Sequence, residues 1–516
     1  MHTQSVMCLI VCLAGALSVA ASETARGQVG SATTDASQSV VTERDQWRYT
    51  QYATYQLAER EVRLQPQAEF RPSLGLRLIA NQMEMVEGNA AIHYLAALGF
   101  AEQHPALEAM LAFNRESRQA VDAAGDYTRM AEPYVWLETS PDQLPLERVR
   151  EYLQYSRFQT GHLQRAALRE RCDFDRNVRG ITDPQSYLLP EVQAMRELAR
   201  LQSIRMRVAI AEKRSEDAVQ ILGQQLAMGR HLGQDVFLVT NLVGIAIANM
   251  GLADAVYLCE QPDSPNLYWA LAALPQPLVS MQAGLDFERD ILFAQIPWLR
   301  EVDETPQPAA YWRTQLEQSA TSFQNLGLYL PKITYTPAGF TALIAAAYPG
   351  ARLYLLDEMG MEVADVEALP VTQTVLLAVR RSYEHLRDEL FKRAYAAYPE
   401  SQRFDFDKSR IALKTKYGLI IELSEFYLPG LTSIMSARAR LQQLLALLQT
   451  IESLRDYMAG NGGRLPAELN QLRLPAPHDP VTGQPFDYRL QTDRAILSGA
   501  QVGTLKYQLH LTAAAP

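Results

Sequence analysis

The sequence predicts an all-α fold, an irregular stack of helical hairpins, followed by a small C-terminal α+β module. Three observations support this fold class. Apolar residues recur at spacings of three and four from about Thr42 to Met458, which is the period of an amphipathic helix. Prolines interrupt the pattern where helices are expected to end. Beyond Phe486 the spacing changes to two, which is typical of half-buried strands.

The composition is that of an ordinary globular protein. The chain has 516 residues, 48% hydrophobic and 21% charged, with a formal net charge of −10. These values exclude a wholly disordered chain and a small disulfide-rich scaffold. The acidic balance argues against a general nucleic-acid-binding protein, because phosphate contacts require clustered lysine and arginine. We therefore expect no nucleic-acid partner, and no cofactor is expected because the glycine motifs that bind nucleotides are missing from the sequence.

The first residues are typical of a secretory signal. An uncharged apolar run from Cys8 to Ala21 ends in small residues suited to cleavage, and it is too short to span a bilayer comfortably. We predict a signal peptide over residues 1–21 and a flexible polar leader over residues 22–40. The chain is therefore expected to be exported to the periplasm or cell envelope, without membrane attachment once the signal is removed.

The predicted helical body covers residues 41–458, and its clearest unit is a hairpin over residues 186–233. Ser215 is the expected N-cap of the second helix, with Glu216 and Asp217 in the first turn. Helix, short turn and helix is the unit of tetratricopeptide-type arrays, but no clean repeat of about 34 residues occurs. We therefore expect an irregular stack that is tetratricopeptide-like only in part. The apolar stripe of the first helix consists of Leu188, Val192, Met195 and Ala199.

A central buried helix is predicted over residues 236–258. Val236 to Ala253 contains no charged residue over 18 positions, which is close to the minimum length of a membrane span. Polar residues such as Asn241 and Asn249 interrupt the run, and neither flank is rich in lysine or arginine. A helix buried in the protein explains these features better than a span does.

The C-terminal module is predicted over residues 459–516. A run of glycines after the last long helix stops it, because glycine accepts the left-handed cap conformation. Asp479-Pro480 and the Gly483 that follows have the chemistry of a turn. The alternating apolar residues of the two predicted strands are Phe486, Tyr488 and Leu490, then Leu505, Tyr507, Leu509 and Leu511.

Two stretches carry a resemblance to known proteins. LRDYMAGNGGRLPAELNQL, followed by APHDPVTGQPFDYRL, resembles the C-terminal region of an uncharacterised group of secreted bacterial α-helical proteins, as does NLVGIAIAN upstream. This resemblance implies a helical envelope protein and no assigned activity. The shorter LP…DPxTGxPxxY pattern is similar to the C-terminal segment of type II secretion pseudopilins. The chain departs from pseudopilins because it lacks their single N-terminal helix followed directly by a sheet.

The turn in the C-terminal module is a candidate calcium site. Asp479, Thr482 and Asp487 surround it, and carboxylates with nearby carbonyl oxygens suit Ca²⁺ outside the cell. The simpler interpretation is that Asp479 bonds the amides of its own turn while Asp487 faces water. No other metal site is expected, because the sequence has no cysteine–histidine cluster with zinc spacing.

Cys172 and Cys259 are the two cysteines that remain after the predicted signal is removed. In an oxidising compartment they form a candidate disulfide, which would stabilise the fold by roughly 4 kcal/mol in the chain-entropy model. The alternative is two buried free thiols, because the sequence does not fix the distance between them.

Catalytic residues are not recognisable in the sequence. No serine-hydrolase elbow or HExxH motif occurs, and we expect each helical histidine, including His93 and His162, to be a packing residue. Acidic pairs on predicted helices are the weak candidates for glycosidic cleavage. They are Glu288 with Asp290, and Asp388 with Glu389.

These observations favour an exported, non-enzymatic helical scaffold that binds a protein partner in the cell envelope. Two alternatives stay open. One is a cell-wall-directed hydrolase that uses carboxylates borne on helices. The other is a pseudopilin-like or membrane-attached component of an assembly.

Overall fold

The structure is a computed structural model that describes residues 41–44, 47–100, 104–123, 131–178, 187–325, 337–492 and 494–514. The predicted signal peptide (1–21) and leader (22–40) lie outside these residues. The described chain divides into two compact units. Unit 1 holds Leu285–Met435 with the described part of Asn177–Leu188, and unit 2 holds the described remainder, from both ends of the chain and from its middle.

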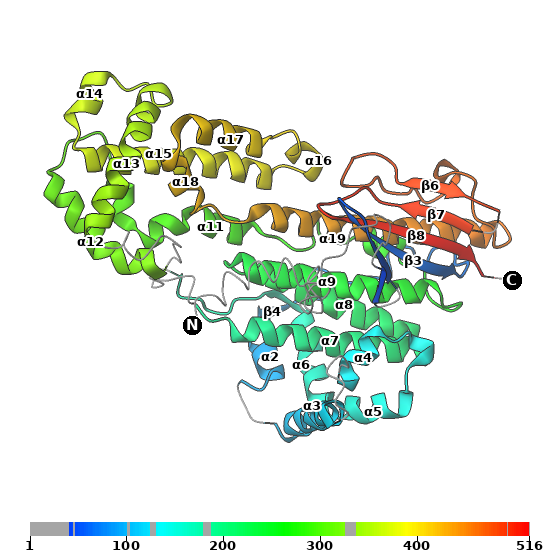
Figure 1. Ribbon diagram of the computed structural model, residues 1–516. Coiled ribbons are helices and arrows are strands. Elements are labelled where there is room, and N and C mark those ends of the chain that lie inside the picture. Colours follow the sequence, from blue (N-terminus) through cyan, green and yellow to red (C-terminus); the bar gives the residue numbers. More distant parts are fainter. Residues whose placement is uncertain are drawn as a thin grey trace, which may run out of the picture. The chain divides into compact units, whose positions relative to one another are not determined.

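A mixed sheet in unit 2 joins the two ends of the described chain (Figure 1). The strand order is β1-β2-β3-β8-β7-β6. Only β3 and β8 pair in parallel, from Gln56 opposite Leu505 to Leu64 opposite Ala513, and the other neighbours are antiparallel. The strands are β1 (Val41–Arg44), β2 (Trp47–Gln51), β3 (Gln56–Leu64), β6 (Asp487–Leu490), β7 (Arg494–Ser498) and β8 (Leu505–Ala513).

The prediction of helix from residue 41 onward was wrong for residues 41–64, and the fold is α+β rather than all-α. In β3 the buried positions alternate with exposed ones toward its end, but one of the buried positions is an arginine. Arg60 is 1% exposed, lies 4.4 Å from the centroid of the Tyr257 ring and donates to the carbonyl of Ala253 at 3.1 Å. A charged residue facing inward hides the period of two that identifies a strand.

The predicted C-terminal strands are present, but they complete a larger sheet. Alternating apolar residues of β8 face the interior, with Leu509 and Leu511 buried. The long helix α19 (Leu431–Gly460), whose residues from Ser436 onward belong to unit 2, packs against this C-terminal region. Gln443 of α19 donates to the carboxylate of Asp479 and to the carbonyl of Ala500.

Helices make up the rest of unit 2, and three of them pack on one another at its centre. The remaining helices and a short parallel strand pair lie around them. The central helices are α7 (Pro190–Ala211), α8 (Ser215–Leu232) and α9 (Leu238–Cys259). The others are α2 (Ala90–Ala97), α3 (Pro105–Ala123), α4 (Glu132–Glu138), η1 (Pro141–Gln143), α5 (Leu146–Gln154), α6 (Arg157–Ala167), α10 (Tyr268–Ala272) and η5 (Leu469–Gln471), with β4 (Val86–Asn89) and β5 (Arg169–Arg171).

The hairpin expected over residues 186–233 corresponds to α7 and α8. Lys213 has a φ of 58°, which turns the chain sharply between the two helices. Ser215 is not the N-cap. It is the first residue of α8, and Arg214 occupies the cap position without a side-chain hydrogen bond. The helix therefore begins one residue earlier than predicted. The acidic residues Glu216 and Asp217 lie in its first turn, as expected.

The helix expected over residues 236–258 corresponds to α9. It is long and apolar enough to cross a membrane, but 72% of its most apolar window is buried inside the structure. The side-chain amide of Asn241 has partners within unit 2, since it donates to the carbonyls of Leu232 and Asp235, at 3.0 Å each. Burial on this scale is typical of a core helix.

Unit 1 is helical throughout its described residues and packs around an apolar cluster. Trp312, Tyr354 and Leu377 lie at the centre of this cluster, each at most 1% exposed. Close helix packing is visible at Gly350, where a Cβ would collide with the carbonyl oxygen of Tyr417. The elements are α11 (Gln282–Gln295, which begins in unit 2), η3 (Pro297–Glu301), α12 (Ala309–Asn325), α13 (Pro337–Asp357), α14 (Val363–Ala368), α15 (Val371–Tyr395), α16 (Tyr398–Ser401), α17 (Phe406–Tyr417) and α18 (Leu419–Glu425).

Candidate functional site

The predicted calcium turn is occupied by protein donors. Asp479 is 2% exposed, and its carboxylate accepts hydrogen bonds from Gln443, from the amide of Val481 at 2.9 Å and from the amide of Ala500 at 2.7 Å. Asp487 is exposed and pairs with Arg489 at 2.8 Å. The Thr482 hydroxyl accepts from the amide of Gln484 at 3.2 Å. The geometry is that of a self-bonded turn, and the described residues contain no cluster of three metal-ligating side chains.

The two cysteines are buried free thiols rather than a disulfide. The backbone amide of Cys172 donates to Gln234 at 2.7 Å, whereas the Cys259 sulfur lies 3.5 Å from the carboxylate of Glu452. Burial raises the pKa of both thiols above the ordinary value for cysteine. Both side chains therefore act as small apolar groups in the core of unit 2.

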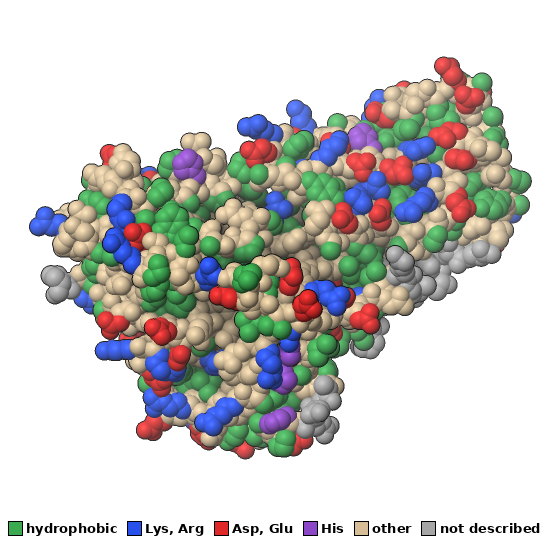
Figure 2. All heavy atoms as spheres, turned by 180° about the vertical axis from the view of Figure 1, so that it is seen from behind, with side chains coloured by type: hydrophobic (Ala, Val, Ile, Leu, Met, Phe, Trp, Pro, Cys, Tyr) green, Lys and Arg blue, Asp and Glu red, His purple; other side chains and the backbone are tan. Residues whose placement is uncertain are grey.

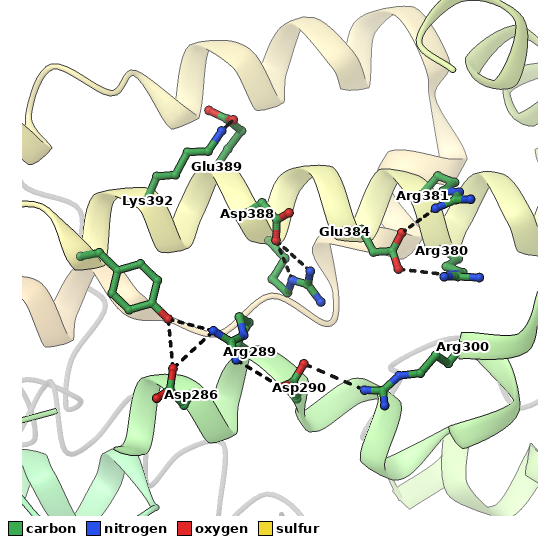
Figure 3. Close-up of polar contacts among 12 residues, drawn as sticks. Asp286, Arg289, Asp290, Arg300, Arg380, Arg381, Glu384, Asp388, Glu389 and Lys392 are labelled. Atoms are coloured by element: carbon green, nitrogen blue, oxygen red, sulfur yellow. Dashed lines mark hydrogen bonds and ion pairs between the residues drawn. The ribbon is translucent and has the colours of Figure 1, made fainter. Parts of the chain in front are cut away.

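The acidic pairs proposed for glycosidic cleavage lie in unit 1, and three of the four carboxylates are bound to arginine or lysine (Figure 3). Asp388 pairs with Arg387 at 2.8 Å, and Glu389 pairs with Lys392. Asp290 lies 3.4 Å from Arg289 and 4.0 Å from Arg300. These pairs have the spacing of ordinary ion pairs along and between helix surfaces.

Glu288 is the exception among these acids. Burial raises the pKa of its carboxyl to about 7, which is the range in which a carboxylic acid donates a proton at neutral pH. Its nominal partner Asp290 has half of its side chain exposed and is bound to two arginines. The acid and the second carboxylate therefore have different environments, and neither lines the two hollows of unit 2 described below.

A groove in unit 2 has a volume of ≈ 970 Å³. One wall is the irregular segment between β3 and β4, residues 67–84, and the other is the face of α8 that carries Val219, Gly223 and Ala227. The end of α6 and the loop after α9 complete it, through Leu168 and Asn266. A smaller hollow of ≈ 310 Å³ lies on the same segment, at Arg77–Gln82.

Contact between α8 and segment 67–84 depends on a glycine. At Gly223 a Cβ would collide with the carbonyl oxygen of Leu78. Leu78 is buried, so the segment is held against the helix at that point. Glycine is the residue that permits such a close backbone approach.

Charges are fixed at one end of the groove. The Glu69 carboxylate accepts from Arg473 at 3.0 Å and from the indole of Trp269 at 3.2 Å. The hydrogen bond from Arg473 is the main reason why the pKa of Glu69 lies below its usual value. Arg473 also pairs with Asp456 at 2.5 Å. These contacts of Glu69 therefore hold segment 67–84 in place at this end of the groove.

The backbone of the groove segment has unused hydrogen-bonding capacity. Within the described part of the chain, residues 76–80 make no backbone hydrogen bond with another residue. Leu78 is buried with its carbonyl against Gly223, but the other residues of that stretch are exposed or partly exposed, so water satisfies their backbone groups in the free protein. A row of unpaired N–H and C=O groups beside a groove is the feature that an extended peptide can pair with.

Apolar side chains project from the same segment. Met83 is 92% exposed and Leu74 64% exposed, and Phe70 at 38% lines the groove. Single exposed apolar residues are ordinary, but several on one irregular segment beside a hollow mark an interaction surface. No pattern in the sequence predicts this site, because the segment lacks periodicity and indicates only a break between helices.

His93 and His162 were expected to be partly buried packing residues, and the structure places their rings near each other. They lie on α2 and α6 with ring centroids 6.0 Å apart, and each is only partly buried. His231 does pack in the core, where it is 0% exposed. It accepts from the Tyr94 hydroxyl at 2.8 Å and donates to the carbonyl of Arg169 at 2.7 Å. Burial is the main reason why the pKa of His231 falls to about 3.

Comparison with known protein families, with curated proteins and with solved structures finds no match to this chain.

Proposed function

We propose that this chain is an exported, non-enzymatic protein of the cell envelope, and that it binds an extended segment of a partner protein in the groove of unit 2. The observation that carries the proposal is the unpaired backbone of residues 76–80 along the wall of that groove. Export is inferred from the signal-like N-terminal residues of the sequence.

The chemistry of the groove indicates what such a segment must offer. Backbone pairing requires an extended peptide, and the apolar side chains of Phe70 and Leu76, which line the groove, favour aliphatic or aromatic residues at alternate positions of that peptide. Charged residues of both signs, such as Arg77 and Glu84, line the groove. The partner is therefore expected to be selected by shape and apolar contact rather than by net charge.

Selection from a displayed random-peptide library tests the proposal, followed by fluorescence anisotropy with the selected peptides. We expect alternating apolar sequences, and a Phe70→Glu, Leu76→Glu variant, which changes two apolar residues that line the groove, should bind them at least tenfold more weakly. Ile411→Glu is the matched control, because Ile411 is an exposed apolar residue (55%) of unit 1. Equal binding by wild type and the groove variant would refute the proposal.

The hydrolase alternative has one specific observation in its favour, the raised pKa of Glu288. It requires that the protein release reducing ends or peptides from purified peptidoglycan. It further requires that Glu288→Gln abolish the release while Asp388→Asn leaves it intact. Absence of release by the wild-type protein would remove this alternative.

A further inference from the structure

The smaller hollow of unit 2 adjoins the groove and is lined differently. Its volume is ≈ 310 Å³, which is at the small end of ligand pockets. Segment Arg77–Gln82 lines it, together with Arg230 from the last turn of α8 and the chain from the end of α10 to Pro275. Arg77–Ala80 line the groove as well, so the two hollows share this stretch of backbone. We call the smaller hollow the end pocket.

Arg230 presents a positioned guanidinium to the end pocket. Its Nη2 donates to the carbonyl of Arg169 at 3.1 Å and lies 3.1 Å from Nε2 of His231, which is buried. Among the described residues, every hydrogen bond of this guanidinium uses Nη2, which leaves Nη1 for a ligand. Burial is the main reason why the pKa of Arg230 lies below its ordinary value. A guanidinium that has lost part of its water gains more from an anionic acceptor than an exposed one does.

The segment supplies further donors to the end pocket. The backbone amides of Ile79 and Ala80 donate to no other residue in the described part of the chain, and both residues are only partly buried. Arg77 lies here too, with a side chain that is 45% exposed and 3.6 Å from Glu84, and water weakens such a pair. Unpaired backbone amides beside a guanidinium are the groups that capture the terminal carboxylate of a peptide.

The rest of the end pocket is apolar. Met85, Leu274 and Pro275 line it, with Ala270 and Ala273. Leu274 is buried, whereas Ala273 and Pro275 are exposed at the rim. An apolar wall close to a cationic donor suits a ligand that carries an aliphatic group next to a carboxylate. The last residue of a peptide chain is such a ligand.

General charge does not attract an anion to this protein. The chain has a formal net charge of −10, and Figure 2 shows acidic and basic side chains interspersed over the face that it draws. A carboxylate is therefore bound where single donors are fixed in place, rather than by a broad positive surface.

We propose that the end pocket holds the C-terminal residue of the partner segment. Arg230 and the amides of Ile79 and Ala80 bind its free carboxylate, and Leu274 contacts its apolar side chain. This inference rests on the proposed function, because the preceding residues of the segment lie in the groove. It adds the class of partner, which is a protein with a free C-terminus that ends in an aliphatic residue.

Peptides that end in leucine test the proposal, each made with a free carboxylate and as the C-terminal amide. The two forms differ only in the terminal charge and in the hydrogen bonds that this end accepts. By fluorescence anisotropy on the full chain, we expect the free acids of the groove-binding peptides to bind at least tenfold more tightly than the amides.

A short probe reports on the end pocket alone. Acetyl-Ala-Ala-Leu is too short to fill the groove, and NMR of the methionine methyl groups detects it. The free acid should shift the signal of Met85, which lines the pocket, and the amide should not. The signal of Met359, a 40% exposed residue of unit 1, should stay unchanged with both.

Variants identify the groups that bind the carboxylate. Arg230→Gln should remove the preference for the free acid. Ala273→Phe should do the same by filling the pocket from an exposed position, and it leaves Arg230 intact if the first variant fails to fold. Arg157→Gln is the matched control, because Arg157 is an exposed arginine of α6 that lines neither hollow.

The outcomes separate this inference from the proposed function. Equal binding of acids and amides by the wild-type protein, with the Phe70→Glu, Leu76→Glu variant still weaker, would overturn the inference and leave the groove standing. Peptides that need an internal aspartate or glutamate instead of a terminal carboxylate would also overturn it, as would loss of the acid preference in Arg157→Gln. A shift of Met85 with the tripeptide acid, without any groove-binding peptide, would support the end pocket and refute the groove.

Discussion

The two units differ in what they bury. Unit 2 contains ion pairs in its interior, such as Arg207 with Asp254, which are 2% and 1% exposed and 2.9 Å apart. Unit 1 is built on an apolar cluster, and its charged residues pair at the surface, as Figure 3 shows for α11 and α15. Arg289 and Asp286, for example, are 39% and 45% exposed.

The difference follows from how each unit is assembled along the chain. The described core of unit 1 is drawn from one continuous stretch, whereas unit 2 brings together both ends of the described chain and its middle. Arg455 joins those parts, since it donates to the carbonyls of Gln65, Ser264 and Pro265 and pairs with Glu452 at 2.8 Å. We infer that buried charges specify which distant segments meet in unit 2, a role that helix packing supplies locally in unit 1.

Replacing Arg455 should therefore have the largest effect on stability. Arg455→Met leaves the Glu452 carboxylate buried without its partner, which costs about 3–5 kcal/mol of unfolding free energy. Urea denaturation measures the loss of unfolding free energy. Hydrogen exchange should show that the backbone amides of β3 and of the loop after α9 become less protected. The double variant with Glu452→Leu should recover part of it, because the unpaired charge is then gone. An Arg455→Met protein as stable as wild type would contradict the proposed role of buried charge.

One buried group in each unit should respond to pH in the opposite direction to the other. In unit 2 the folded pKa of His231 is about 3 against 6.5 for an ordinary histidine, so the unfolded state binds the extra proton. His231 therefore lowers the stability of unit 2 as pH falls from 6.5 toward 3. In unit 1 the folded pKa of Glu288 is about 7 against 4.5. The folded state binds the extra proton there, so Glu288 lowers the stability of unit 1 as pH rises from 4.5 to 7.

Hydrogen exchange at several pH values, corrected for the intrinsic exchange rate, measures how the stability of each unit changes with pH. Each group contributes at most about 1.4 kcal/mol per pH unit inside its window. Glu288→Gln should flatten the profile of unit 1 alone, and His231→Gln should flatten that of unit 2 alone. A change in the profile of the other unit would show that the assigned groups are not responsible.

The sequence predicts the long helices well because the apolar stripe that identifies each helix lies within that helix. The stripe Val375, Val379, Tyr383, Leu386 and Leu390 lies on α15, and all five side chains are buried. The N-terminal strands were missed because Arg60 occupies a buried position of β3. The groove was not predicted, because it depends on contacts between distant residues, such as Gly223 with Leu78. No local pattern encodes such contacts.

Glycines at close helix contacts offer a smaller test that applies to both units. Gly223→Ala places a Cβ against the carbonyl of Leu78, and Gly350→Ala places one against the carbonyl of Tyr417. Each should lower the unfolding free energy by about 1–3 kcal/mol through overpacking. Gly161→Ala is the control, because its Cβ would have no heavy atom closer than 3.9 Å. It should stabilise α6 by roughly 0.5–1 kcal/mol.

The position of Gly223 gives its variant a functional readout as well. Displacing segment 67–84 from α8 should weaken peptide binding in the groove, whereas Gly350→Ala should not. Loss of binding in both variants would indicate general unfolding rather than a local change.

Surface ion pairs of unit 1 should have the smallest effect. Arg289→Gln removes contacts with Asp286 and Asp290, but all three side chains are between 39% and 52% exposed. Water already screens such charges, so the loss should stay below about 1 kcal/mol and vanish at high salt. Urea denaturation at low and high ionic strength measures both. A loss comparable to that of Arg455→Met would mean that unit 1, like unit 2, depends on ion pairs, and the contrast between the units would fail.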